Sequence, residues 1–253
     1  MYKRMNEQLQ KEGAMALVTG ASSGIGLAYA RELARRGYDL LLVSNEQERI
    51  GTVAEELAAA FGVKTIPLCM DLARSEAARE LYDYCEREKL QIGILVNNAG
   101  IFFFDDLTEV APERIETMLL LHIRTVTLLC RYFGAAMKRR RAGYILNMSS
   151  LSAWTPAPGI SVYAASKSYI RKFSQMLRYE LHQYGVGVTT VCPGAIATGL
   201  YNLSDYYQRL ALRLGVMMKP ERLARKGLRA MFARRDYILP GAVNRFFVLA
   251  LYL

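Results

Sequence analysis

The sequence predicts a single α/β domain in which a parallel sheet of about seven strands is covered by helices on both faces. Short runs rich in Val, Ile, Leu and Thr alternate with longer stretches of helical periodicity, and this alternation is typical of a doubly wound sheet. The 253 residues suffice for one such domain. No linker, internal repeat or low-complexity tract divides them, so residues 1–253 are treated as one unit.

Seven apolar runs are predicted to be strands. They are short and mostly continuous in their apolar residues, which suits a sheet that is buried on both faces. In chain order they are 14–19, 38–44, 63–70, 92–98, 143–149, 186–192 and, as the candidate seventh, 236–241.

Helices are predicted in the intervals between these strands. They cover residues 25–36, 47–61, 75–89, 112–139 and 162–184. A further amphipathic helix is predicted from "ERLARKGLRAMF", where Leu223, Leu228 and Met231 share one face and the basic residues share the other.

The net charge of +10 raises the question of a polyanionic partner. Between residues 209 and 235, nine Lys or Arg stand against one acid. A solvated helix face is the favoured interpretation, because no nucleic-acid motif accompanies the charge, and no nucleic-acid partner is expected. Contact of residues 222–235 and the apolar tail 246–253 with an anionic membrane is a less favoured alternative to burial of that tail.

Cysteine and histidine usage limits the other classes of site. The four cysteines are scattered without a C-x-x-C pair, which predicts neither a disulfide framework nor a zinc site. With only two histidines, no metal centre is expected. The N-terminus has no apolar signal core, and no apolar run approaches the length of a membrane span, so a cytoplasmic location is expected.

The stretch "LVTGASSGIG" carries two overlapping motifs. Residues 20–24 spell G-x-S-x-G, the elbow that presents the nucleophile of a serine hydrolase. Alternatively, Gly20 permits a tight turn, Gly24 lets the backbone approach a pyrophosphate, and Gly26 lets the following helix pack against the sheet. The hydrolase remains a remote alternative, because its elbow normally follows several strands and His182 falls within a regular helix.

Four further motifs follow the glycine turn in order. They are "NNAG" (97–100), Ser150, "YAASK" (163–167) and "CPGAIAT" (192–198). With them the chain resembles, over nearly its whole length, the short-chain dehydrogenases/reductases, which are oxidoreductases with an NAD(P)-binding Rossmann fold. The resemblance implies interconversion of a carbonyl and an alcohol on a small molecule by hydride transfer, and a homodimer or homotetramer. It also implies a substrate loop at about 199–220. The basic helix and tail at 220–253 come after this loop.

The resemblance assigns the catalytic roles. Tyr163 and Lys167 lie four residues apart and share a helix face. The resemblance implies that Tyr163 exchanges a proton with the carbonyl oxygen, that Ser150 hydrogen-bonds that oxygen, and that Lys167 tunes Tyr163 and binds the nicotinamide ribose. A relative that binds nucleotide but has lost catalysis is the alternative, and the intact set of three residues argues against it.

The resemblance also implies a set of cofactor contacts. Asp71 matches an acid that bonds the adenine amino group; a helix cap is also a reasonable interpretation, and both roles could hold. The full set comprises Gly20, Ser22, Ser23, Gly24, Ile25, Gly26, Ser44, Asn45, Asp71, Leu72, Asn98, Ala99, Gly100, Tyr163, Lys167, Pro193, Gly194, Ile196 and Thr198.

Two positions depart from the family pattern. Ser44 and Asn45 end the second strand without the acid that binds the ribose of NAD, and without the Arg that binds the phosphate of NADP. With no acid to repel a phosphate, NADP(H) is favoured over NAD(H). His122 aligns with an Asn that holds a relay water in the family. It is either a catalytic relay group that titrates near neutral pH or a packing residue.

Aromatic and apolar residues near the motifs bear on the substrate. They are "IFFF" (101–104), Trp154, and Tyr201, Tyr206, Tyr207, Leu210, Met217 and Met218. If several line the pocket, the substrate is a bulky apolar ketone or alcohol. If they do not, they belong to the core or to an interface.

Overall fold

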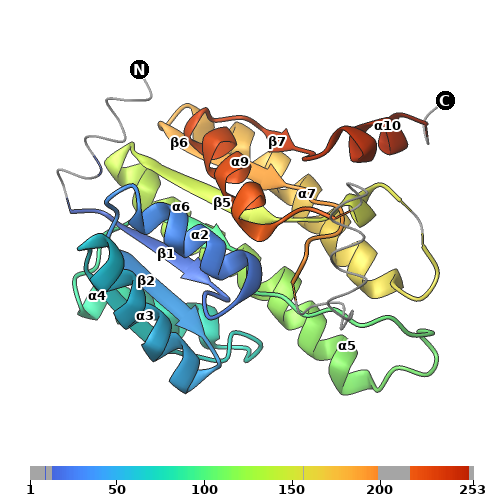
Figure 1. Ribbon diagram of the computed structural model, residues 1–253, viewed down its shortest axis with the longest axis horizontal. Helices are drawn as coiled ribbons and strands as arrows, with labels where there is room; N and C mark the ends of the chain where they lie inside the picture. Colours follow the sequence, from blue (N-terminus) through green and yellow to red (C-terminus); the bar gives the residue numbers. More distant parts are fainter. Residues whose placement is uncertain (1–8, 10–12, 156, 199–216, 251–253) are drawn as a thin grey trace.

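A computed structural model describes residues 9, 13–155, 157–198 and 217–250 of the chain. It contains a sheet of seven parallel strands in the order β3-β2-β1-β4-β5-β6-β7, which confirms the predicted doubly wound fold (Figure 1). The strands are β1 (Met15–Thr19), β2 (Leu40–Ser44), β3 (Thr65–Cys69), β4 (Ile92–Asn97), β5 (Gly143–Met148), β6 (Val186–Val191) and β7 (Tyr237–Ile238).

Helices cover both faces of the sheet. One layer contains α2 (Gly24–Ala34), α3 (Gln47–Phe61) and α9 (Pro220–Phe232). The other contains α4 (Ala77–Arg87), α6 (Val126–Arg140) and α7 (Ser161–His182). The remaining helical segments are α5 (Pro112–Leu119), η1 (Leu120–Thr125), η2 (Leu151–Ala153) and α10 (Ala242–Ala250).

The five central strands contribute side chains to two cores because their residues alternate between the faces of the sheet. In β1, Ala16 and Val18 pack in the core beneath α2, α3 and α9. Met15 and Leu17 pack in the core beneath α4, α6 and α7. This two-sided burial explains the continuous apolar runs of the sequence.

Two predicted elements differ from the structure. The helix predicted over 112–139 is divided, because residues Leu120–Thr125 form a π-helical turn between α5 and α6. The side chain of Thr125 in this turn donates a hydrogen bond to the carbonyl of Leu72, 2.8 Å away. An inserted π turn leaves no periodic signal in a run that is apolar on most sides. The seventh strand is real but has two residues rather than the six predicted.

The arrangement of β1 and β4 positions the site. The chain runs outward from β1 through β2 to β3, then returns to β4 on the other side of β1. In such sheets, ligands bind where the strand order reverses, outside the carboxyl ends of the strands. Gly20 follows β1 at this point, and Asn98 follows β4. None of the described helices is long and apolar enough to cross a bilayer.

Candidate active site

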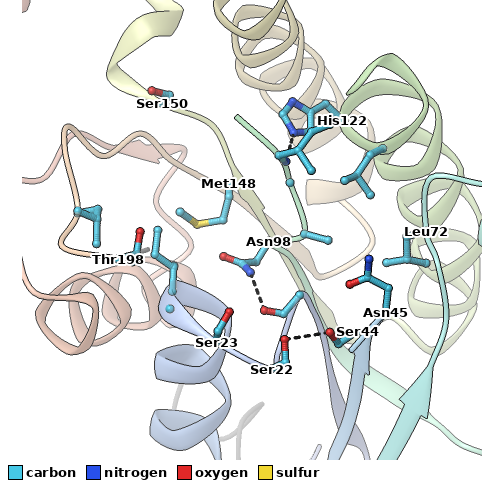
Figure 2. Close-up of a pocket in the computed structure, with 18 of the residues that line it drawn as sticks. Ser22, Ser23, Ser44, Asn45, Leu72, Asn98, His122, Met148, Ser150 and Thr198 are labelled. Atoms are coloured by element: carbon cyan, nitrogen blue, oxygen red, sulfur yellow. Dashed lines mark hydrogen bonds between the residues drawn. The ribbon is translucent and has the colours of Figure 1, made fainter. Parts of the chain in front are cut away.

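A cavity of about 630 Å³ opens at this reversal point, a size typical of small-molecule sites. Figure 2 shows Ser22, Ser23, Ser44 and Asn45 toward one end of it, and Ser150 and His122 toward the other. The residues predicted from the sequence line this cavity, with the exception of Gly26. The structure therefore brings together motifs that are distant in the sequence.

The glycine turn forms a cradle that side chains would fill. Gly20 has a φ of 64°, and a Cβ there would lie 2.9 Å from the Cα of Ala99. A Cβ at Gly26 would lie 1.9 Å from the carbonyl oxygen of Gly20, so this glycine serves helix packing rather than the cavity lining. Gly24, with a φ of 54°, faces the methyl group of Thr198. This geometry agrees with the predicted roles of Gly20 in a tight turn and of Gly26 in close packing, and the approach of a pyrophosphate at Gly24 stays a prediction.

The N-terminus of α2 is available to an anion. Its N-cap residue, Ser23, makes no side-chain capping bond, and its first turn contains no acidic residue. The first N–H groups of a helix need partners and carry positive potential. A pyrophosphate would satisfy both conditions, so the residues here fit a dinucleotide.

Side-chain hydrogen bonds tie the glycine turn to the end of β4. The Thr19 hydroxyl accepts from the backbone N–H groups of Asn98 and Ala99, at 2.9 and 3.0 Å. The Asn98 amide donates back to the carbonyls of Thr19 and Gly20. These bonds hold the two turns of the crevice in a fixed relation.

Ser150 lies just beyond the end of β5 as the N-cap of η2. Its hydroxyl oxygen accepts a hydrogen bond from the backbone N–H of Ser152, at 3.2 Å. Because the oxygen is the acceptor, the hydroxyl proton can point into the cavity and donate to a ligand oxygen.

Tyr163 and Lys167 reach the same end of the cavity from α7. The Lys167 amine lies 5.4 Å from the centre of the Tyr163 ring and donates to the carbonyl of Met148, at 3.2 Å. Burial disfavours its charged form and lowers the pKa of Lys167 to about 8. Phe102 packs edge-on against the Tyr163 ring, with 5.0 Å between ring centres.

Both ring nitrogens of His122 are bonded to protein groups. The Ile101 N–H donates to Nε2, at 3.1 Å, so the proton of the neutral ring is on Nδ1, which donates to the Ser166 hydroxyl, at 2.9 Å. Ser166 in turn donates to the carbonyl of Tyr163, at 2.7 Å. Burial, together with the charge of Lys167, holds the pKa of His122 well below its ordinary value. This lowered pKa argues against the titration near neutral pH that the relay hypothesis expected.

The opposite end of the cavity contains two residues that the sequence reasoning missed, Glu46 and Arg49. The Ser22 hydroxyl donates to the Glu46 carboxylate, at 2.5 Å, and accepts from the Ser44 hydroxyl, at 2.9 Å. Arg49 lies 3.9 Å from the same carboxylate. The end of β2 lacks an acid and an arginine at Ser44 and Asn45, as predicted, but the start of α3 brings one of each to the cavity. Their spacing of three residues at the start of α3 could have revealed a shared face.

Asp71 lines the cavity as predicted, but it does not cap a helix. Its carboxylate accepts from the backbone N–H of Ala73, at 2.9 Å. Helix α4 begins only at Ala77, so the helix-cap interpretation is wrong.

The family model described as short chain dehydrogenase matches residues 14–205. The chain belongs to this family. The duck (Anas platyrhynchos) very-long-chain 3-oxoacyl-CoA reductase is 37% identical over 76% of this chain and 62% of its own length. The human inactive hydroxysteroid dehydrogenase-like protein 1 is 32% identical over 79% of this chain and 61% of its own. The chain thus spans about six tenths of the length of the curated relatives it matches.

Solved structures of dehydrogenases share the fold. One from Sphingobium yanoikuyae in complex with NADPH is 30% identical, with a TM-score of 0.83 over 94% of this chain and 93% of that one. The bulky-bulky ketone specific alcohol dehydrogenase from Comamonas testosteroni is 28% identical, with a TM-score of 0.80 over 94% and 91%.

The surroundings of Ser22 and of the two histidines do not form the catalytic site of a serine hydrolase, in agreement with the family membership. The Ser22 hydroxyl is held by Glu46 and Ser44 rather than by a histidine. His122 is bonded to Ser166 and Ile101, and His182 is the last residue of α7. Neither histidine is therefore placed to activate a serine nucleophile at this turn of the short-chain dehydrogenase.

The aromatic and apolar residues predicted near the substrate lie in different parts of the structure. Ile101 lines the cavity, and Phe103 is buried in a small separate cluster. Phe104 is largely exposed, and the Trp154 ring packs against Tyr237 and Arg171 outside the cavity. Met217 and Met218 line a separate small cavity instead. Tyr201, Tyr206, Tyr207 and Leu210 lie outside the described residues.

Proposed function

We propose that the protein is an NAD(P)-dependent oxidoreductase that interconverts a ketone or aldehyde with the corresponding alcohol. The observation that carries the proposal is a single cavity with two complementary ends. One end has the uncapped helix N-terminus and the glycine cradle, and the other has Ser150, Tyr163 and Lys167. Anion binding and proton transfer are thus available within reach of one elongated ligand.

The residues that would hold the cofactor fall into three groups. The N-terminus of α2 would bind the pyrophosphate, the turn at 98–100 would lie beside it, and the segment from Pro193 to Thr198 would close over it. When bound, a nicotinamide cofactor supplies the hydride.

The chain's own residues supply the proton chemistry. Ser150 donates a hydrogen bond to the carbonyl oxygen and orients it, and Tyr163 gives its phenolic proton to that oxygen during reduction. The ammonium of Lys167 stabilises the phenolate that remains, and the reverse sequence serves alcohol oxidation. Because Lys167 loses its proton as the pH rises through about 8, the reductive rate should fall above that value.

His122 is best understood as a positioning residue. Through Ser166 it fixes the start of α7 where Tyr163 lies, and through Nε2 it fixes the backbone of Ile101 beside the cavity. Both ring nitrogens are already hydrogen-bonded. The neutral ring could therefore accept a further proton only by giving up the bond from the Ile101 N–H. It therefore supports the geometry of Tyr163 and Lys167 rather than the transfer of the proton.

We also propose that NADP(H) is preferred to NAD(H). Arg49 lines the end of the cavity where the adenine ribose would lie, and its guanidinium can pair with a 2′-phosphate. Glu46 opposes this choice but is already engaged by Ser22. Titration of both cofactors tests the preference, and Asn45→Asp should move it toward NADH. Tighter binding of NADH by the unmodified protein would refute it.

A bulky apolar carbonyl compound is the proposed substrate class. Ile101 lines the cavity with an apolar side chain, and Phe102 packs edge-on against the ring of Tyr163 behind it. Relatives named for very-long-chain 3-oxoacyl-CoA, hydroxysteroids and bulky-bulky ketones support the same class. A panel of such ketones and alcohols, followed through the absorbance of both cofactors, tests the function.

The second candidate is a nucleotide-binding protein without catalysis. The name of the human relative, which is called inactive, favours it. The presence of Ser150, Tyr163 and Lys167 around one cavity favours the enzyme. If the protein binds the cofactor but turns over none of the ketones and alcohols in the panel, the second candidate is correct.

Assembly and location complete the proposal. The chain is one domain that forms a homodimer or homotetramer through α7, where Tyr169, Met176 and Tyr179 are partly exposed. Met176→Glu should lower the mass measured by light scattering if this face is used.

A cytoplasmic, reducing compartment is supported by the free thiols of Cys85, Cys130 and Cys192, which are buried singly.

A further inference from the structure

Helix α9 carries a row of cations on its outer face. Arg222, Lys226 and Arg229 are spaced at i, i+4 and i+7, which places them on one side of the helix. The opposite side is fixed against the fold: Leu223 and Leu228 are fully buried, and a Cβ at Gly227 would lie 2.1 Å from the Tyr29 hydroxyl. The helix therefore cannot rotate to bury its charges.

Arg245 of α10 adds a fourth cation to this row, here named the basic stripe. Its Nε donates to the carbonyl of Leu239, at 3.0 Å, which fixes the side chain near α9. Partial burial, together with the charges of Arg222, Arg245 and Arg229, lowers the pKa of Lys226, as expected for cations close together. Within the part of the chain that the structure describes, none of these four cations forms an ion pair.

Helix α10 exposes apolar side chains next to the basic stripe. Val243 and Phe246 are 65% and 74% exposed, at a spacing of three residues that places them on one face. Asn244 points the other way, donates to the carbonyl of Pro240 at 2.7 Å, and packs against Gly194. Figure 1 shows α9, β7 and α10 following one another along one side of the molecule.

We propose that the basic stripe and the outer face of α10 form a docking surface for an anionic lipid bilayer. The stripe offers concentrated positive charge, and the adjacent Phe246 and Val243 offer apolar groups that can enter the headgroup region. A second copy of the chain fits poorly, because a two-fold interface here would place the stripe against itself. A soluble polyanion would use the cations but leave the exposed phenyl group without a role.

Docking would place the bilayer beside the active-site cavity. Gly194 lines that cavity, and a Cβ on Gly194 would lie 2.7 Å from Asn244 on the inner face of α10. The surface is thus continuous with a wall of the site. The inference itself rests on the charges and exposed side chains and does not depend on the reaction.

The test is co-sedimentation of the full chain with vesicles of phosphatidylcholine alone and of phosphatidylcholine with phosphatidylserine. Binding is expected only to the vesicles that contain phosphatidylserine, and it should weaken strongly at high salt, where charges are screened beyond about 3 Å. Equal binding to both vesicles, salt-independent binding, or no binding would overturn the proposal.

Two variants locate the surface. Arg222→Glu/Lys226→Glu should lower vesicle affinity at least about tenfold, since each basic residue near an anionic surface contributes about fivefold. Phe246→Ser, which removes the apolar group without changing the charge, should lower it while leaving heparin binding unchanged. Lys64→Glu/Lys89→Glu is the control with the same change of charge at exposed positions elsewhere, and it should bind nearly as the wild type does.

Three results would contradict this assignment. The control pair could lose as much affinity as the stripe pair, which would indicate net charge rather than a site. Phe246→Ser could bind vesicles as well as the wild type, which would indicate a polyanion site. Phe246→Ser could instead convert an oligomer to a monomer in light scattering without vesicles, which would assign this face to a second copy. Circular dichroism of each variant verifies folding.

Discussion

The two ends of the cavity are built differently. At the catalytic end, His122 and Ser166 are fully buried, Lys167 is nearly so, and each is held by hydrogen bonds to the backbone or to one another. At the nucleotide end, the Glu46 and Arg49 side chains are 49% and 58% exposed at the start of α3. The end proposed to perform the chemistry is fixed by packing, whereas the end proposed to select the cofactor can change by surface substitution.

The largest effect expected from this division is that of Tyr163→Phe. Removing the phenolic proton should lower turnover by about 10²–10⁴-fold, the usual contribution of a general acid or base. Cofactor affinity should stay near the wild-type value, because the anion-binding end is untouched. Steady-state rates and cofactor titration measure the two quantities.

Tyr179→Phe is the matched control on the same helix, and it should retain wild-type turnover because that ring is exposed. Near-normal turnover of Tyr163→Phe on a good substrate would remove the proton-transfer role.

The catalytic end also carries a cost in stability that depends on pH. Burial lowers the pKa of Lys167 to about 8, so between about pH 8 and its ordinary pKa the unfolded chain binds more protons than the folded chain. The free energy of unfolding of the wild type therefore increases as the pH rises through that window. Below about pH 8, burial of the charged Lys167 lowers this free energy by its full amount. Lys167→Met lacks the term, so its stability relative to wild type should be highest near pH 7.

Urea unfolding over a pH series measures this relative stability. The advantage of Lys167→Met should shrink by on the order of 3 kcal/mol toward about pH 10. Lys172→Met, at an exposed position of the same helix, should show no such trend. Parallel curves for wild type and Lys167→Met would show that burial does not perturb this lysine.

His122 tests whether positioning alone supports catalysis. His122→Leu leaves the partly buried Ile101 N–H without its acceptor, which should cost about 1 kcal/mol of unfolding free energy and lower turnover. His122→Asn can supply an acceptor and should restore much of both. The wild-type pH–rate profile should contain no ionisation of His122 near neutral pH.

Nitrogen chemical shifts should place the His122 proton on Nδ1, and Ser166→Ala should weaken that preference. If His122→Leu folds normally and turns over like the wild type, the network is dispensable. A wild-type ionisation near neutral pH that His122→Asn lacks would restore the relay hypothesis.

The smallest effect is expected at the nucleotide end. Arg49→Ala should weaken NADPH binding by about fivefold, because an exposed ion pair contributes at most about 1 kcal/mol. NADH binding should change little, since it lacks the phosphate. Arg31→Ala, an exposed arginine on α2, is the control. Equal losses for both cofactors would assign Arg49 to the adenosine in general.

The same contrast explains what the sequence could predict. The short apolar runs predicted the strands of the parallel sheet because a sheet buried on both faces requires them. The glycine turn predicted the crevice because its backbone needs glycine. The π turn around His122 could not be predicted, because its neighbours are apolar on nearly every side. Glu46 and Arg49 were missed because their role depends on how the start of α3 faces the cavity.

One paired measurement tests the division of labour most directly. NADPH affinity and turnover at saturating NADPH would be determined for Tyr163→Phe and Arg49→Ala beside the wild type. The expected result is that Tyr163→Phe loses turnover at unchanged affinity, while Arg49→Ala loses affinity at unchanged turnover. If each variant changed both quantities together, or if the wild type bound no nicotinamide cofactor, the account of a cavity with two separate ends would be contradicted.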